Sequence, residues 1–349
     1  MPEGLMDKAR ERLEHLWRRG REFLGTEYAI MGGAMSWISE RQLVAAISNG
    51  GGFGVLACGS MGPGLLREEI RATQELTARP FGVNLITLHP DLDALIDVCG
   101  EMQVGHIVLA GGLPSAASIK RAKDTGAKVI CFAPAVVLAK KLLRAGVDAL
   151  VIEGAEAGGH VGPVATSVLA QEILPVIDQV PVFVAGGIGR GEAIVSYLEM
   201  GASGCQLGTR FVCASECIAH PNFKKAFIRA AARDALPSVQ VDPQFPVIPV
   251  RALSNNATRR FILFQMEVIS RFKSGEIEQK DAQLEIEHFW AGALKRAVID
   301  GDVENGSLMA GQSVGMVTRE QPTAEILQEL LSQALAALAD RHGPVPVQA

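Results

Sequence analysis

The sequence predicts an α/β fold in which eight parallel strands, each followed by a helix, close into a barrel. Short apolar runs recur between residues 27 and 211 at the spacing of a strand–helix unit. The runs are nearly continuous Val, Ile, Leu and Ala, as expected for parallel strands covered on both faces. Eight such units are the number that closes a barrel, whereas an open doubly wound sheet needs only five or six strands.

The predicted strands are Tyr28–Met31, Phe53–Ala57, Phe81–Ile86, His106–Ala110, Lys128–Ala133, Ala149–Glu153, Val182–Ala185 and Cys205–Phe211. The predicted helices between them are Glu40–Ser48, Gly64–Ala78, Asp91–Met102, Pro114–Thr125, Val136–Ala145, Ser167–Ile177 and Gly191–Met200. The first helix opens with "SERQ", which predicts a capping box between Ser39 and Gln42. This pattern is that of a TIM (β/α)8 barrel.

Three further segments flank or follow the predicted barrel core of residues 27–211. Residues 1–26 predict an amphipathic helical extension that packs on the main domain. In residues 212–320 the strand–helix rhythm stops, and longer helical patterns predict a smaller helical insert, or cap region, at the barrel mouth. Residues 321–349 contain a final helix, Ala324–Asp340, whose single apolar face predicts packing on the barrel.

The composition narrows the possible partners. A net charge of −5, a pI near 5.9 and 5% aromatic residues argue against nucleic-acid binding. No apolar run approaches the length of a membrane span, and we expect a cytoplasmic protein. The six cysteines lie mostly in apolar segments, so we expect reduced core residues and no metal site.

Glycine pairs follow the seventh and eighth predicted strands. Gly186 and Gly187 leave backbone amides accessible, and Gly208 with Thr209 adds an amide and a hydroxyl. Barrels of this kind often bind a phosphate group with these two loops. Tight turns alone could explain either pair, but two pairs at these strands predict a phosphate site.

The sixth predicted strand ends in "EGAEAGGH", which combines two acids with a lone histidine. Gly158 and Gly159 remove side chains at the strand end, so that a ligand can approach and His160 can point into the mouth. A hydrogen bond to backbone would also explain an imidazole in this loop, but its position favours proton transfer. For Glu153 and Glu156 we expect polar contacts to a ligand rather than paired hydrolytic acids.

In these features the chain resembles the nitronate monooxygenase (formerly 2-nitropropane dioxygenase) family of FMN-dependent barrels. The flavin-dependent type of enoyl-acyl-carrier-protein reductase is similar and shares most of the motifs. The resemblance runs from about residue 31 to residue 317. It rests on "SNGGGFGVL", "PFGVNL", "EGAEAGGHVG", "VPVFVAGGIGRG", "GASGCQLGTRF" and "SLMAGQSVGMV".

The resemblance implies a flavoprotein that binds FMN over the strand ends, with the phosphate on the two glycine loops. His160 would lie beside the substrate as the catalytic residue. In monooxygenase members the position of Glu153 is commonly glutamine, whereas the reductase type often carries glutamate. The FMN-binding residues implied by the resemblance are Gly32, Gly33, Asn84, Glu153, Gly158, Gly186, Gly187, Gln206, Gly208 and Thr209.

Three functions follow as expectations. The first is an oxidoreductase that uses O2 to convert alkyl nitronates to a carbonyl compound and nitrite, with His160 as base or hydrogen-bond partner. The second is an NAD(P)H-dependent flavin reductase acting on enoyl thioesters or quinones. The third is a barrel that only binds a phosphorylated metabolite, against which His160 argues because silent binding needs no proton-transfer group.

Overall fold

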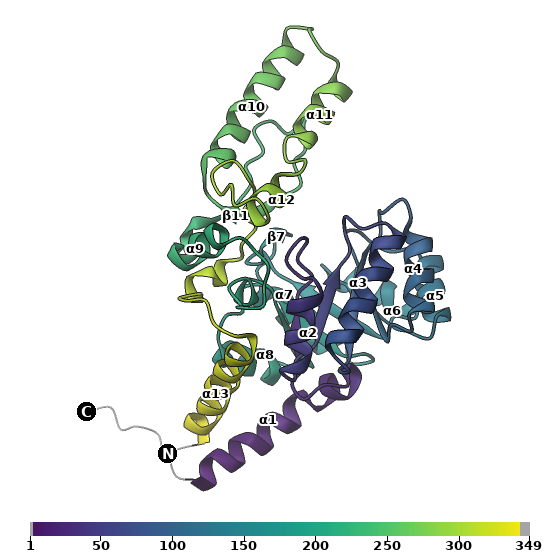
Figure 1. Ribbon diagram of the computed structural model, residues 1–349, viewed down its shortest axis with the longest axis vertical. Coiled ribbons are helices and arrows are strands. Elements are labelled where there is room, and N and C mark those ends of the chain that lie inside the picture. The colour runs from purple at the N-terminus through teal and green to yellow at the C-terminus, as the bar shows by residue number, and fades with distance from the viewer. Residues whose placement is uncertain (1–2, 343–349) are drawn as a thin grey trace, which may run out of the picture.

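The computed structural model describes residues 3–342 and shows an eight-stranded parallel sheet closed into a barrel, with helices around it (Figure 1). Residues 1–2 and 343–349, at the ends of the predicted first and last segments, lie outside the described part. The strand order is β1-β9-β8-β6-β5-β4-β3-β2. A parallel bridge between Met31 and Phe53 joins the two outer strands, so the predicted barrel is confirmed.

The bounds of the barrel elements agree closely with the prediction. The strands are β1 Ile30–Gly32, β2 Gly54–Ala57, β3 Phe81–Ile86, β4 His106–Ala110, β5 Lys128–Phe132, β6 Ala149–Glu153, β8 Val182–Ala185 and β9 Gly204–Leu207. The helices between them are α2 Arg41–Asn49, α3 Pro63–Leu76, α4 Leu92–Glu101, α5 Ala116–Asp124, α6 Val136–Arg144, α7 Thr166–Ile173 and α8 Gly191–Glu199.

Two local predictions were wrong. The eighth strand ends at Leu207 rather than Phe211, because the backbone turns at Gly208 into a short 3-10 helix, Thr209–Phe211. The capping box at α2 is absent, because Glu40 rather than Ser39 caps the helix by accepting from the amides of Gln42 and Leu43. Ser39 instead donates its hydroxyl to the Gly33 carbonyl at 2.9 Å and so anchors the loop after β1.

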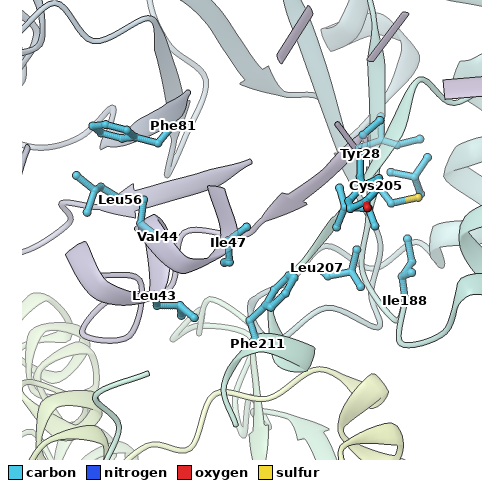
Figure 2. Packing of buried hydrophobic residues seen from close by; sticks show 14 of the residues in the cluster. Tyr28, Leu43, Val44, Ile47, Leu56, Phe81, Ile188, Cys205, Leu207 and Phe211 are labelled. Carbon is cyan, nitrogen blue, oxygen red and sulfur yellow. The ribbon is translucent and has the colours of Figure 1, made fainter. Parts of the chain in front are cut away.

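Side chains fill the barrel inside and out. The interior holds alternate residues of the strands, among them Phe53, Val108 and Phe183. A second layer packs the strands against the helices; Figure 2 shows part of it, with Ile47 of α2 and Leu207 of β9. All six cysteines are free and buried, as expected from their apolar surroundings.

The two terminal helices, α1 Glu3–Leu24 and α13 Thr323–His342, pack against each other on the barrel (Figure 1). Leu24, at the end of α1, joins the interior cluster and closes the barrel end opposite the site. α13 lies so close to α8 that a Cβ on Gly191 would lie 2.1 Å from the Leu330 carbonyl oxygen. No helix among residues 3–342 is long and apolar enough to cross a bilayer.

The cap combines a small sheet with four helices and has a core of its own. Its longest helices project from the barrel at the end of the molecule far from α1 (Figure 1). Phe245, Phe261 and Ile286 are buried together in this core. The cap elements are β7 Gly159–His160, α9 Pro221–Arg229, β10 Ala235–Pro237, β11 Val250–Leu253, α10 Asn256–Lys273, α11 Gln279–His288 and α12 Ala293–Val298. The antiparallel order β10-β11-β7 draws the loop after β6 into the cap sheet.

Candidate functional site

The two glycine loops leave neighbouring strand ends. Ala185 of β8 is in register with Gln206 of β9, so Gly186-Gly187 and Gly208-Thr209 begin side by side. The amides of Gly186, Gly187 and Gly208 have no hydrogen-bond partner among residues 3–342. Free amides that converge at strand ends form an anion site, so the geometry fits the predicted phosphate cradle.

Both residues of the first loop require glycine. Gly186 and Gly187 have φ values of +100° and +71°, which side chains rarely adopt. A Cβ would also lie 2.9 Å from the Thr166 hydroxyl at the first position and 2.9 Å from the Glu156 Cβ at the second. The loop is therefore pressed against the start of α7, and its amides have no hydrogen-bond partner among the described residues.

Three polar side chains occupy strand ends at the barrel mouth. Asn84 of β3 and Gln206 of β9 are buried, and Glu153 of β6 is half-buried. No other described residue hydrogen-bonds to these three side chains. Burial raises the pKa of the Glu153 carboxyl to about 7. Buried polar groups normally have partners, so these three are suited to the polar edge of a ligand.

The loop after β1 lies beside this group. The Gly33 amide donates to the Leu207 carbonyl at 2.9 Å, and a Cβ on Gly33 would lie 3.5 Å from the Gln206 side-chain nitrogen. Gly32 has a packing reason to be glycine, because a Cβ there would lie 2.5 Å from the Ile47 Cδ1. The structure thus brings Gly33 and Gln206 together, whereas Gly32 faces α2.

The loop after β6 carries His160 into the cap. His160 pairs with Val250 of β11, and its side chain is exposed and hydrogen-bonded to no other described residue. Partial burial lowers the imidazole pKa, which favours the neutral ring. Gly158 packs beneath it, where a Cβ would lie 2.5 Å from the Gly311 amide nitrogen.

Glu156 has a structural role at the start of α7. Its carboxylate accepts from the Thr166 amide at 2.8 Å and from the Thr166 hydroxyl at 2.9 Å. Both hydrogen bonds hold Thr166, the first residue of α7, which stabilises the start of the helix. The Glu156 carbonyl also accepts from the Gln312 amide at 2.9 Å. Glu156 therefore positions the loop after β6.

Two supporting groups were missed at the sequence level. Arg251 is buried and donates to the carbonyls of Ala155 at 2.8 Å and Ala235 at 2.6 Å, which ties the β6 loop to the cap. The Gly311 amide donates to the Thr209 hydroxyl at 3.0 Å. The Arg251–Ala155 and Gly311–Thr209 contacts join segments about a hundred residues apart. The motif "SLMAGQSVGMV" contains Gly311, whereas no sequence motif singled out Arg251.

A cavity of about 580 Å³ opens beside His160 in the cap. This volume lies within the roughly 300–1,000 Å³ of pockets for drug-sized ligands. Its lining is mostly apolar and comes from the cap sheet, the cap helices and the segment after α12. Among the lining residues are Leu236, Val247, Ile248, Ile262, Trp290 and Met309.

The sequence model of the nitronate monooxygenase family matches residues 18–101 and 92–333. The chain belongs to the nitronate monooxygenase family. It is therefore a flavin-dependent oxidoreductase, and the predicted family and enzyme class are confirmed.

Two solved structures are similar to this chain over most of its length. The solved structure of FabK from Thermotoga maritima is 33% identical, with a TM-score of 0.84, over 93% of this chain and 98% of that one. The nitroalkane oxidase of Streptomyces ansochromogenes is 26% identical, with a TM-score of 0.74, over 89% and 97%.

Two kinds of curated relative are equally similar in sequence. A (3aS,4S,5R,7aS)-5-hydroxy-7a-methyl-1-oxo-octahydro-1H-indene-4-carboxyl-CoA dehydrogenase of Rhodococcus jostii is 28% identical over 90% of this chain and 94% of its own length. A probable nitronate monooxygenase of Staphylococcus aureus is 28% identical over 91% and 98%.

Proposed function

We propose that the chain is an FMN-dependent, nicotinamide-linked oxidoreductase of thioesters that carry a bulky apolar acyl group. The observation that carries this proposal is the apolar cavity of about 580 Å³ next to His160. A small alkyl nitronate would leave most of that space empty, whereas a ring system or long chain would fill it. The name of the Rhodococcus jostii relative describes a fused-ring CoA thioester, which agrees with this size.

The mouth of the barrel fits FMN. The free amides of Gly186, Gly187 and Gly208 suit its phosphate, and Thr209 can donate a hydroxyl proton there. Asn84, Gln206 and Glu153 would hold the polar edges of the ring and ribityl chain, and Gly33 would allow close approach. When bound, FMN supplies the hydride chemistry that this chain's side chains lack.

His160 would move the proton that accompanies hydride transfer. A neutral imidazole can accept a proton from the acyl chain when a saturated thioester is oxidised, and it returns that proton when an enoyl thioester is reduced. The lowered pKa of His160 keeps the ring neutral and ready for the first of these steps. Net reduction consumes one hydride from NAD(P)H and one proton.

Nitronate monooxygenation is the second candidate. It is supported by the family itself and by the Staphylococcus aureus relatives named for that activity. In that reaction His160 would remove a proton from a neutral nitroalkane or hydrogen-bond the anion. The smaller substrate leaves the cap cavity without a role, so we rank this activity second.

Anaerobic mixing distinguishes the two candidates. The purified flavoprotein is mixed with NADH, NADPH or an alkyl nitronate while flavin absorbance is followed. Bleaching by a nicotinamide, followed by recovery of colour on adding a bulky enoyl-CoA, is the expected result. Bleaching by nitronate alone, with nitrite formed in air, would instead establish the monooxygenase.

A further inference from the structure

A second cleft, of about 610 Å³, lies in the cap beside the apolar cavity. The two hollows share one wall residue, Trp290. The cleft is formed by α10, the end of α11 and the start of α12. Unlike the apolar cavity, it is lined by the cationic side chains of Arg260 and Arg296 together with His288.

Two arginines of the cleft lining form no ion pair with any described residue. Arg260 and Arg296 are exposed and form no ion pair within residues 3–342. The acid in the lining, Glu285, is already paired with Arg271 at 2.8 Å. The Asn305 side chain is held by the Asp302 carboxylate at 3.1 Å. Arg296 donates one N–H to the Ala291 carbonyl at 3.1 Å. Both guanidinium groups keep further N–H donors for an anion, and arginine binds phosphate especially well.

The inner wall of the cleft is aromatic. The rings of Phe289 and Trp290 meet edge to face at 5.0 Å, and Phe264 lies 5.2 Å from Phe289. Phe261, whose ring lies 5.3 Å from that of Trp290, lines the apolar cavity. An aromatic wall beside free arginines can stack a base while the arginines hold its phosphates.

We propose that this cleft, the nucleotide cleft, binds the phosphorylated nucleotide of a ligand whose reactive end reaches His160. This inference rests on the proposed function, because an oxidoreductase of that kind has two ligands that contain a nucleotide. One is the carrier end of a CoA thioester, with its acyl group in the apolar cavity. The other is the adenosine end of the nicotinamide cosubstrate. Both offer a base for Trp290 and phosphates for Arg260 and Arg296.

Calorimetry with the flavin-loaded protein tests the proposal. The probes are adenosine 3′,5′-bisphosphate for the CoA end and adenosine 2′,5′-bisphosphate for the NADP end. We expect the double variant Arg260→Ala/Arg296→Ala to bind at least one probe about tenfold or more weakly than the wild type. A loss of affinity for the 3′,5′-bisphosphate would identify the CoA thioester as the ligand of the cleft. A loss of affinity for the 2′,5′-bisphosphate would identify the nicotinamide dinucleotide.

The control is Lys280→Ala, which removes an exposed cation of α11 that does not line the cleft. It should bind both probes as the wild type does. Flavin content and the melting temperature show that each variant is folded. Equal affinity of the double variant and the wild type for both probes would overturn the proposal, as would a wild type that binds neither. Because this assay needs no turnover, its failure is distinct from a failure of the flavin-bleaching experiment.

Discussion

Gly158 faces Gly311 so closely that a Cβ on Gly158 would lie 2.5 Å from the Gly311 amide nitrogen. This approach packs the β6 loop against the segment whose Gly311 amide binds the Thr209 hydroxyl. The two loops that carry His160 and the phosphate cradle are thereby held together by backbone contact. A side chain at residue 158 would separate them.

We therefore expect Gly158→Ala to destabilise the protein by about 1–3 kcal/mol, the usual cost of overpacking. Denaturant unfolding measures this directly. Gly162→Ala is the matched control in the same loop, because no atom lies within 4 Å of its added Cβ. That variant should stay within about 0.5 kcal/mol of the wild type. Equal stability of the two variants would show that the contact at Gly158 is not tight.

Gly187→Val should weaken FMN binding about tenfold or more, because the branched side chain strains a residue with φ +71° and crowds Glu156. Titration of the apoprotein with FMN, followed by flavin fluorescence, gives the affinity. Gly201→Val is the control. It has φ +106° but open space around its Cβ, and it lies before β9, at the other end of the barrel. This control should lose stability and keep its FMN affinity. If both variants lost FMN affinity equally, the phosphate would not bind at Gly187.

The barrel was predictable because its strands are uninterrupted apolar runs bounded by turn residues. Val182–Ala185, for example, lies between Pro181 and Gly186, and its observed bounds are those predicted. That the two glycine loops lie side by side was predictable as well. They follow consecutive strands of the barrel, and consecutive strands are neighbours in this fold.

The cap sheet was not predictable in this way. β7 has only two residues, and its partner β11 follows about ninety residues later. Neither segment has the length or the alternation that marks a strand in a sequence. The Ser39 prediction failed for a different reason, because its hydroxyl donates to the Gly33 carbonyl within the loop after β1 and Glu40 caps the helix. Contacts across long sequence separations carry no local signal.

Acid should destabilise the protein through His106, at the barrel end closed by α1. Its Nε2 lies 3.0 Å from the Phe23 carbonyl oxygen, and burial lowers its pKa to about 4 from an ordinary 6.5. The unfolded chain therefore binds a proton more readily, so stability is lost as pH falls from 6.5 toward 4. We expect a loss of about 2 kcal/mol between pH 7.5 and pH 5.

Urea unfolding of the wild type and His106→Gln at both pH values isolates this effect. We expect the variant to be less stable than the wild type at both pH values. The fall of about 2 kcal/mol in its free energy of unfolding between pH 7.5 and pH 5 should disappear. An unchanged pH dependence in the variant would assign the acid sensitivity to other groups.

Glu153 should have the opposite pH dependence. Burial raises its pKa from 4.5 to about 7, so the folded chain holds the proton more tightly than the unfolded chain. Stability is then lost as pH rises from 4.5 through 7. We compare the free energy of unfolding of Glu153→Gln with that of the wild type, both without FMN. The difference in favour of the variant should be about 2 kcal/mol larger at pH 8 than at pH 5. Thermal unfolding at the two pH values checks this, and an equal effect at both would show an ordinary carboxyl pKa.

His160→Ala should retain FMN and lose most turnover. The imidazole lines the apolar cavity and hydrogen-bonds to no described residue of the glycine loops, so we expect its removal to leave the phosphate cradle intact. General acid–base groups typically contribute about 10²–10⁴ to a rate, and we expect a fall in kcat of that size. Flavin content of the purified variant and steady-state rates with NADPH and a bulky enoyl-CoA measure the two effects separately. His15→Ala, on α1 at the far side of the molecule, is the control and should turn over normally. If His160→Ala remained fully active, the proton would have to come from another group or from water, and His160 would only line the cavity.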